Sequence, residues 1–287
     1  MEKQGLNSQA KKEKILLKPW EKLRKLLMSD ERLILLNEFS AVDLNLFNKK
    51  IINDTVMKIV YESTNEIFAN KLNKFKEIQI IKPITTLSKS DLLKFYQEKV
   101  DNTGNLQLWP CEEILTLYCL FNYPKFLNKR IIELGAGFSG LCSLAIKKNL
   151  EIGELFITDG NSKSVEALET NVDLNFKDRK DIFCKELIWN AKANNEFGEF
   201  DYVLISDCLF FKNYHYDLVI TIKRLLKKGG ECIIVAPPRG DSMDIFLKIA
   251  EPHFDIVKST EEIDFVKQTK NITDNYNPFY INLTLKK

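Results

Sequence analysis

The segment from residue 130 to residue 140, Arg-Ile-Ile-Glu-Leu-Gly-Ala-Gly-Phe-Ser-Gly, most constrains how this chain folds. Its first half, residues 131–134, is a short apolar run typical of a strand buried on both faces. Glycines at G-x-G-x-x-G spacing follow, and Ser139 stands where a side-chain oxygen can cap a helix. Strand, glycine turn and helix in this order form the setting in which a nucleotide-type cofactor meets the backbone. A tight connection without any ligand is the plainer alternative.

Two acidic residues sharpen this prediction. Glu133 closes the first strand, and Asp159 follows the next apolar run, residues 155–158, about 20 residues beyond the glycine turn. At that distance the tip of a second parallel strand reaches the ribose of a bound nucleotide. The sequence therefore predicts a cofactor site built around the glycine turn and these two acids.

The composition excludes several classes of protein. With 287 residues, 45% of them hydrophobic, the chain is expected to form one large domain, or one domain with a sizeable extension. The net charge of +2 gives no global signal for a nucleic-acid partner. Six scattered cysteines without a C-x-x-C pair predict buried free thiols, and two histidines make a zinc site a poor fit. Without a signal peptide or an apolar run that could cross a bilayer, we expect a cytoplasmic monomer with no membrane partner, present also in the nucleus.

Residues 1–100 are predicted to form an accessory α+β region rich in lysine and asparagine. Pro19 begins an amphipathic helix whose apolar face includes Trp20. This basic helix either packs on its own domain or binds an acidic groove of a partner. Alternating residues predict strands between residues 39 and 63 and at 78–81, and a short helix follows at 92–96.

Residues 101–287 alternate between strand and helix patterns. The predicted strands are 131–134, 155–158, 182–187, 200–206, 232–236, 254–257 and 279–285. Pro110 suits the first turn of a helix, and Lys-Lys-Gly-Gly at 227–230 is predicted to end the helix that begins near Tyr214. The alternation predicts an α/β fold with a doubly wound, mostly parallel seven-stranded sheet.

Ligands of such sheets bind beyond the carboxyl ends of the strands. Five residues fall at those ends, and their clustering predicts one composite site: Gly135, Asp159, Trp189, Asp207 and Arg239. A dinucleotide is one candidate for the cofactor, but the chain shows no second phosphate-binding motif and no dedicated catalytic histidine. A last strand that alternates suits the methyltransferase version of the fold instead.

A resemblance to a known family rests on six segments. They are Asn-Thr-Gly-Asn at 102–105, Trp-Pro-Cys-Glu-Glu at 109–113, Glu-Leu-Gly-Ala-Gly at 133–137, Thr-Asp-Gly-Asn at 158–161, Asp-Cys-Leu-Phe at 207–210 and Ala-Pro-Pro-Arg-Gly at 236–240. Together they closely resemble the calmodulin-lysine N-methyltransferases, which belong to the seven-β-strand protein methyltransferases that depend on S-adenosylmethionine. Very many methyltransferases share the glycine motif, whereas the first, second and fourth segments are typical of a much smaller group of proteins. The chain departs from the expected pattern after the fifth strand, where Pro238 and Arg239 replace paired basic residues.

The resemblance implies a role for each residue of the site. The implied cofactor-binding residues are Trp109, Glu133, Gly135, Ala136, Gly137, Asp159, Gly160, Asn161, Trp189 and Ser206. Asp207 and Phe210 are the implied catalytic residues, and Arg239 belongs to the rim of the substrate entrance. The plainer alternatives are a core aromatic for Trp189, a helix cap for Asp207 and core packing for Phe210.

The activity that the resemblance implies is methylation of a lysine of calmodulin, up to trimethyllysine. Another lysine-bearing protein substrate stays open as an alternative. Nucleic-acid methylation is disfavoured, because Asp-Cys-Leu-Phe at 207–210 replaces a base-flipping motif such as Asn-Pro-Pro-aromatic. A non-catalytic interaction module of the same fold is an alternative of another class, and it leaves the intact glycine motif and Asp159 unexplained.

Overall fold

The structure, a computed structural model, describes residues 33–35, 46–53, 56–60, 76–81, 86–88, 107–268 and 277–287. The helices predicted at Pro19 and at 92–96, and the domain boundary predicted at residue 100, lie outside these residues. Among the described residues, no helix combines the length and the apolar character that a membrane span requires.

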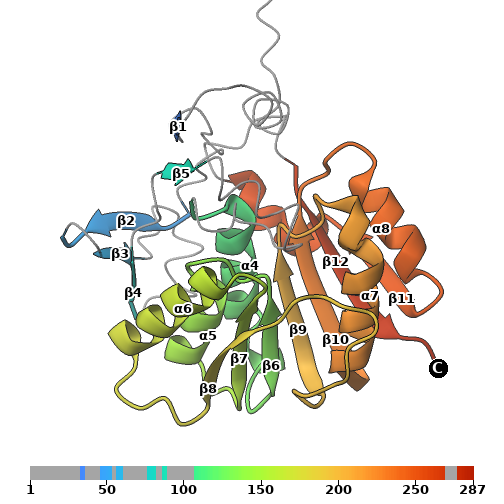
Figure 1. The fold of residues 1–287 in the computed structure, drawn as a ribbon, viewed down its shortest axis with the longest axis horizontal. Coiled ribbons are helices and arrows are strands. Elements are labelled where there is room, and N and C mark those ends of the chain that lie inside the picture. Colours follow the sequence, from blue (N-terminus) through green and yellow to red (C-terminus); the bar gives the residue numbers. More distant parts are fainter. Residues whose placement is uncertain are drawn as a thin grey trace, which may run out of the picture.

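A seven-stranded sheet forms the centre of the fold (Figure 1). Its strand order is β11-β12-β10-β9-β6-β7-β8, in which β6 to β10 pair in parallel and β12 runs antiparallel to both of its neighbours. The strands are β6 Ile131–Leu134, β7 Leu155–Asp159, β8 Ile182–Glu186, β9 Phe200–Ser206, β10 Leu226–Ala236, β11 Phe254–Ser259 and β12 Phe279–Leu285. The predicted α/β class and the mostly parallel seven-stranded sheet are confirmed.

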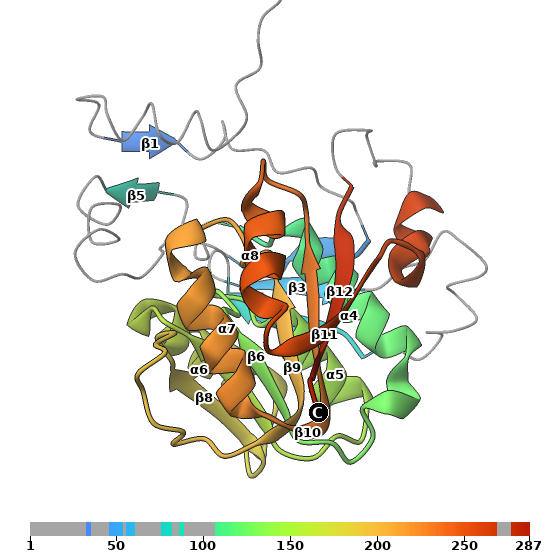
Figure 2. The same ribbon diagram turned by 90° about the vertical axis from the view of Figure 1, so that its right-hand side faces the viewer.

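Helices cover both faces of this sheet. Neighbouring residues of one strand point to opposite faces, so Ile131 packs into the core beneath α4 (Pro110–Phe121), α5 (Leu141–Asn149) and α6 (Ser162–Asn175). Ile132 packs into the second core beneath α7 (His215–Leu225) and α8 (Ser242–Ala250). Figure 2 shows α7 and α8 on one side of the sheet and α4 on the other. Both cores are apolar, and all six cysteines are buried free thiols, as predicted.

Two small sheets come from the accessory region. Strands β2 (Asn48–Ile51), β3 (Val56–Val60) and β4 (Ile78–Ile81) form an antiparallel three-stranded sheet, which confirms the strands predicted there. Strands β1 (Leu33–Leu35) and β5 (Thr86–Ser88) pair antiparallel and were not predicted. Strand β4 lies beside α6 (Figure 1), and its Ile78 and Ile80 are fully buried in the core of α4 to α6. The accessory sheet is therefore packed on the main fold.

Two local predictions are wrong. Ser139 does not cap α5, because the N-cap residue is Gly140, which has a left-handed backbone and no side-chain cap bond. Residues 227–230 do not end α7, because that helix ends at Leu225 and β10 begins at the next residue. The pairing of β10 with β9 shifts its register between Leu226 and Glu231, so the two glycines lie in a bulge of a strand.

Candidate active site

A pocket of about 570 Å³ lies at the carboxyl ends of the parallel strands. In the strand order of the sheet, β7 and β8 follow β6 in one direction, and β9 and β10 follow it in the other. The loops that leave β6 and β9 therefore diverge, and a crevice opens between them. The volume suits a small-molecule site. The lining residues are Trp109, Glu112, Gly135, Ala136, Gly137, Asp159, Gly160, Leu187, Ile188, Trp189, Asn190, Ala191, Lys192, Ser206, Asp207, Cys208, Phe210, Phe211, Tyr214, Tyr216, Asp217 and Arg239.

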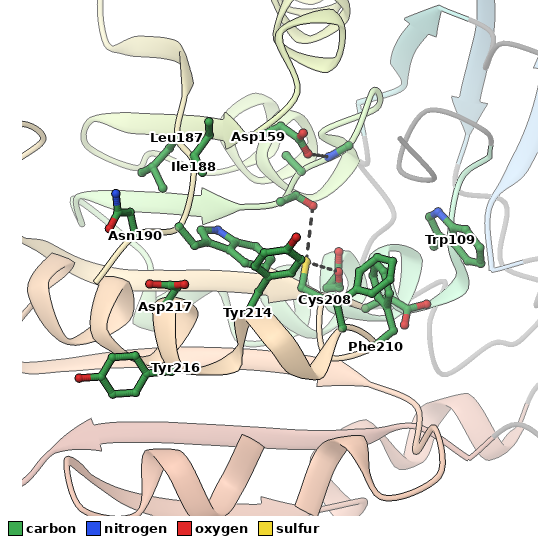
Figure 3. A pocket seen from close by; sticks show the side chains of 18 of the residues that line it. Trp109, Asp159, Leu187, Ile188, Asn190, Cys208, Phe210, Tyr214, Tyr216 and Asp217 are labelled. Carbon is green, nitrogen blue, oxygen red and sulfur yellow. Dashed lines mark hydrogen bonds between the residues drawn. The ribbon is translucent and has the colours of Figure 1, made fainter. Parts of the chain in front are cut away.

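The pocket is elongated (Figure 3). In this view Asn190, Tyr216 and Asp217 lie toward one end, and Trp109 and Phe210 lie toward the other. The first end is formed by the loop after β8 and by α7, and the second by the loop after β9 and the start of α4. A ligand of extended shape would therefore contact different chemical groups along its length.

The glycine turn after β6 forms the floor of the pocket. Gly135 has φ +67°, and a Cβ placed on it would lie 2.6 Å from Cys208 Sγ and 3.3 Å from Trp189 Cζ2. Only glycine fits this position without displacing both neighbours. The glycine thus lets Cys208 and Trp189 approach the backbone of the turn closely, and all three residues line the pocket.

Asp159 ends β7 and holds the glycine turn from below. One carboxylate oxygen accepts the Gly137 N–H at 2.9 Å, and the other accepts the Asn161 N–H at 2.8 Å (Figure 3 draws the first of these bonds). The side chain of Ser164 forms a third hydrogen bond with this carboxylate, whose two oxygens together can accept about four. Burial raises the pKa of Asp159 to about 6, although the two backbone hydrogen bonds and one from the Ser164 side chain lower it. Asn161 caps α6 by accepting the Lys163 N–H, so the end of β7 leads directly into a capped helix.

Glu112 caps α5 in place of the serine that the sequence suggested. The hydroxyl of Ser139 donates to Glu112 Oε1, and the same oxygen accepts the Leu141 N–H at 2.8 Å. Glu112 comes from the first turn of α4, so a long-range contact satisfies the start of α5. Burial, with nearby Glu133 adding to it, raises the pKa of Glu112 to about 8.

Glu133 and Asn161 are the two predicted cofactor-binding residues that do not line the pocket. Glu133 is fully buried on β6, where its Oε2 accepts the Ser143 N–H at 3.1 Å. Burial raises the pKa of Glu133 to about 7. Both residues support the walls of the pocket from behind: Glu133 through α5, and Asn161 through Asp159 and α6.

The wall after β8 carries Trp189 and is anchored by α7. Three polar residues at helical spacing on α7 hold its backbone: Asp217 accepts the Ala191 N–H at 2.8 Å, and Thr221 Oγ1 accepts the Asn190 N–H at 3.3 Å. Arg224 donates to the Asn190 carbonyl oxygen at 2.9 Å. This wall is therefore fixed although it has no regular secondary structure.

Asp207 begins the loop after β9 and forms an ion pair inside the pocket. Its backbone is left-handed at φ +54°, and its side chain is 8% exposed. Arg239 Nη2 donates to both carboxylate oxygens at 2.9 Å, and the guanidinium lies 5.9 Å from the ring of Trp109. Burial raises the pKa of Asp207 above its usual range, and Arg239 opposes that rise. Lys212 and Asp241 form a second ion pair between the same two loops.

Aromatic side chains surround this ion pair. Phe210 and Phe211 have ring centroids 4.3 Å apart, and Tyr214 follows one helical turn later. All three are partly buried and line the pocket. They reduce the access of water to the region around Asp207.

The structure brings most of the predicted site residues together. Those that line the pocket are Trp109, Gly135, Ala136, Gly137, Asp159, Gly160, Trp189, Ser206, Asp207, Phe210 and Arg239. Sequence reasoning missed Glu112, Tyr214 and Asp217, which also line it. An acidic residue in the first turn of a helix is common because it stabilises the helix dipole, so no local pattern indicates that Glu112 reaches another helix.

Comparisons with known proteins agree with this geometry. A family model described as "Lysine methyltransferase" matches residues 87–253, more than half of the chain. The calmodulin-lysine N-methyltransferase of Arabidopsis thaliana is 40% identical over 154 residues, which cover 52% of this chain and 50% of that protein.

Two further relatives are protein methyltransferases whose names do not mention calmodulin. The protein N-lysine methyltransferase METTL21A of Mus musculus is 26% identical, covering 53% of this chain and 69% of that protein. The histidine protein methyltransferase 1 homolog of Bos taurus is 24% identical, covering 57% of this chain and 51% of that protein. The chain thus spans about half the length of the Arabidopsis and bovine relatives.

Proposed function

Because the chain belongs to the lysine methyltransferase family, we propose that it transfers methyl groups from S-adenosylmethionine to a lysine of calmodulin, up to trimethyllysine. S-adenosylmethionine is the methyl donor of this family. The choice of calmodulin is supported by the 40% identity with the Arabidopsis relative. The observation that carries the proposal is that the glycine turn, Asp159 and Asp207 line one and the same pocket.

The residues of the pocket fit the cofactor. The glycine turn lines the pocket, and its backbone at Gly135 would lie beneath the amino-acid part of the cofactor. Asp159 accepts three hydrogen bonds from the protein, and its carboxylate has capacity for one more, from a ribose hydroxyl. Trp189 and Ile188 offer flat and apolar surface for the adenine, and Trp109, Gly160 and Ser206 complete the pocket. When bound, S-adenosylmethionine supplies an electrophilic methyl group on a sulfonium.

Asp207 and Phe210 would receive the target amine. A neutral amine is the nucleophile, and presenting it near pH 7 costs about 4–5 kcal/mol, because free lysine has a pKa near 10.4. The proton leaves to water before attack, so the site needs no dedicated base. The rings of Phe210 and Phe211 then exclude water, and Asp207 orients the amine, with most of the acceleration coming from alignment.

Arg239 lines the pocket, as its place after the fifth predicted strand suggests, and its guanidinium binds Asp207. Its place at the rim of the substrate entrance stays a prediction. A lone carboxylate would stabilise the ammonium form of the incoming lysine, which cannot accept a methyl group. The paired Asp207 and Arg239 carry no net charge, so they can orient the amine with less of this penalty.

Mass spectrometry of unmethylated calmodulin, incubated with the protein and S-adenosylmethionine, tests the proposal. We expect mass gains in steps of one methyl group on a single lysine, lost when that lysine is changed to arginine and lost with the Asp159→Ala variant. No gain on calmodulin while S-adenosylmethionine binds would contradict the choice of substrate and direct the search to other lysine-bearing proteins. No binding of S-adenosylmethionine would favour the non-catalytic module. A cytoplasmic and nuclear location and a monomeric state stay predictions.

A further inference from the structure

Two asparagines of helix α6 bind the outer strand, β4, of the three-stranded accessory sheet. In strand β4, Gln79 and Ile81 direct their backbone N–H groups away from β3, to the edge where the described residues provide no further strand. The Gln79 N–H donates to Asn175 Oδ1 at 2.9 Å, and the Ile81 N–H donates to Asn171 Oδ1 at 2.8 Å. Asn175 Nδ2 returns a bond to the Gln79 carbonyl oxygen at 2.6 Å.

The spacing of the two elements explains this match. Residues four apart on a helix rise by about 6 Å, and residues two apart on a strand rise by about 6.7 Å. Asn171 and Asn175 on α6 therefore meet alternate residues of β4, which lies beside that helix (Figure 1). The amides take the place of a neighbouring strand, which leaves these edge groups satisfied.

Asn171 also reaches the glycine turn. Its Nδ2 donates to the carbonyl oxygens of Phe138 at 2.8 Å and Ser139 at 3.2 Å, and the residue is fully buried. The turn is thus held from three directions: by Asp159 through Gly137, by Glu112 through Ser139, and by Asn171. Asp159 and Glu112 line the pocket, whereas Asn171 does not, so it acts on the pocket through the turn alone.

We propose that Asn171 is a positioning residue that makes strand β4 part of the cofactor site. One amide side chain joins the backbone of the accessory sheet to the backbone of the glycine turn. The accessory region then has a function that its sequence does not reveal. It holds the turn in the conformation that receives the cofactor, and it does so through residues that do not line the pocket.

The Asn171→Asp variant tests the link to the turn. It keeps an oxygen that can accept from Ile81, but it replaces the donating amide by an oxygen that faces two carbonyl groups. Asn175→Asp is the matched control. It lies one helical turn further on and also loses two bonds to carbonyl oxygens, those of Gln79 and Asn171, while its hydrogen bonds do not involve the glycine turn.

The readouts are the dissociation constant of S-adenosylhomocysteine by calorimetry and hydrogen exchange of residues 138–141 in the ligand-free protein. In Asn171→Asp we expect the dissociation constant to rise about tenfold, equivalent to about 1.4 kcal/mol, and the turn to exchange faster. In Asn175→Asp the dissociation constant should change less than twofold. Equal changes in the two folded variants, or an unchanged dissociation constant in Asn171→Asp, would overturn the proposal.

A second pair of variants keeps the test decisive if Asn171→Asp does not fold. Ile81→Pro removes the N–H that binds Asn171, and Gln79→Pro removes the N–H that binds Asn175. Proline is tolerated where an edge strand directs its N–H outward. We expect the dissociation constant to rise about threefold in Ile81→Pro and to stay within error in Gln79→Pro. The reverse order would contradict the assignment of β4 to the cofactor site.

Discussion

Replacing Gly135 by alanine is expected to damage both the fold and the cofactor site. The backbone there is left-handed, which costs a residue with a side chain about 1–2 kcal/mol. The new Cβ would lie 2.6 Å from Cys208 Sγ, so the thiol or the turn must move, at a cost of about 1–3 kcal/mol. Cys208 is buried, with its Sγ 3.2 Å from the Ser206 carbonyl oxygen, so the thiol cannot swing away freely. The total is about 2–5 kcal/mol.

Gly229→Ala is the matched control for the backbone. Gly229 has φ +79°, and a Cβ placed there would meet no atom within 4 Å. Its substitution should cost only the left-handed conformation, about 1–2 kcal/mol. The difference between the two variants therefore measures the crowding against Cys208 and Trp189.

Urea unfolding and calorimetric titration with S-adenosylmethionine are the assays. We expect the Gly135→Ala variant to lose more stability than Gly229→Ala, and to bind the cofactor at least tenfold more weakly. Adding Cys208→Ala to Gly135→Ala should recover part of the stability, a coupling of about 1 kcal/mol or more. If both glycine variants lose the same stability and both bind the cofactor normally, the glycine turn is not the floor of the cofactor site.

Three further variants probe other parts of the pocket. Asp207→Asn should change the dissociation constant of the cofactor less than twofold and lower the rate of methyl transfer about 100-fold, because the target amine loses its alignment. An unchanged rate of methyl transfer would contradict the role assigned to Asp207. Trp189→Ala should weaken cofactor binding about tenfold in calorimetry through lost stacking surface. Folding raises the pKa of Glu112 to about 8, so the protonated carboxyl favours the folded state. This stabilisation is fully present below the pKa of Glu112 in the unfolded chain, and it is lost as the pH rises toward 8. Glu112→Gln keeps the oxygen that caps α5 and should reduce the decline of the melting temperature between pH 5 and pH 8. If the decline is unchanged, groups other than Glu112 cause it.

Local patterns predicted the elements of the main sheet well. The strand Phe279–Leu285 matches its predicted bounds, although its burial does not alternate, because Tyr280 and Ile281 are buried in the cores on opposite faces of the sheet. The sequence predicts correctly that the glycine turn and Asp159 lie at the carboxyl ends of neighbouring strands. The order of strands and helices along the chain determines these two positions.

The parts that sequence reasoning missed depend on partners far away in the chain. Ser139 was read as a cap because it stands at the right position, but the carboxylate of Glu112 takes that function from another helix. Asn171 reads as an ordinary polar residue of α6, and its bonds to β4 and to the turn appear only once three segments are brought together. The glycines at 229 and 230 predict a helix end, but they lie where the register of β10 shifts against β9, and both settings accept glycine readily.

A crystal structure of the protein with S-adenosylhomocysteine would test the central claim most directly. We expect the ligand in the pocket of about 570 Å³, with its ribose within hydrogen-bond distance of Asp159 and its amino-acid part against Gly135. The sulfur should face Asp207 and Phe210, where the target lysine would enter. Electron density for the ligand at any other place, or a ribose that makes no contact with Asp159, would contradict the assignment of this pocket to methyl transfer.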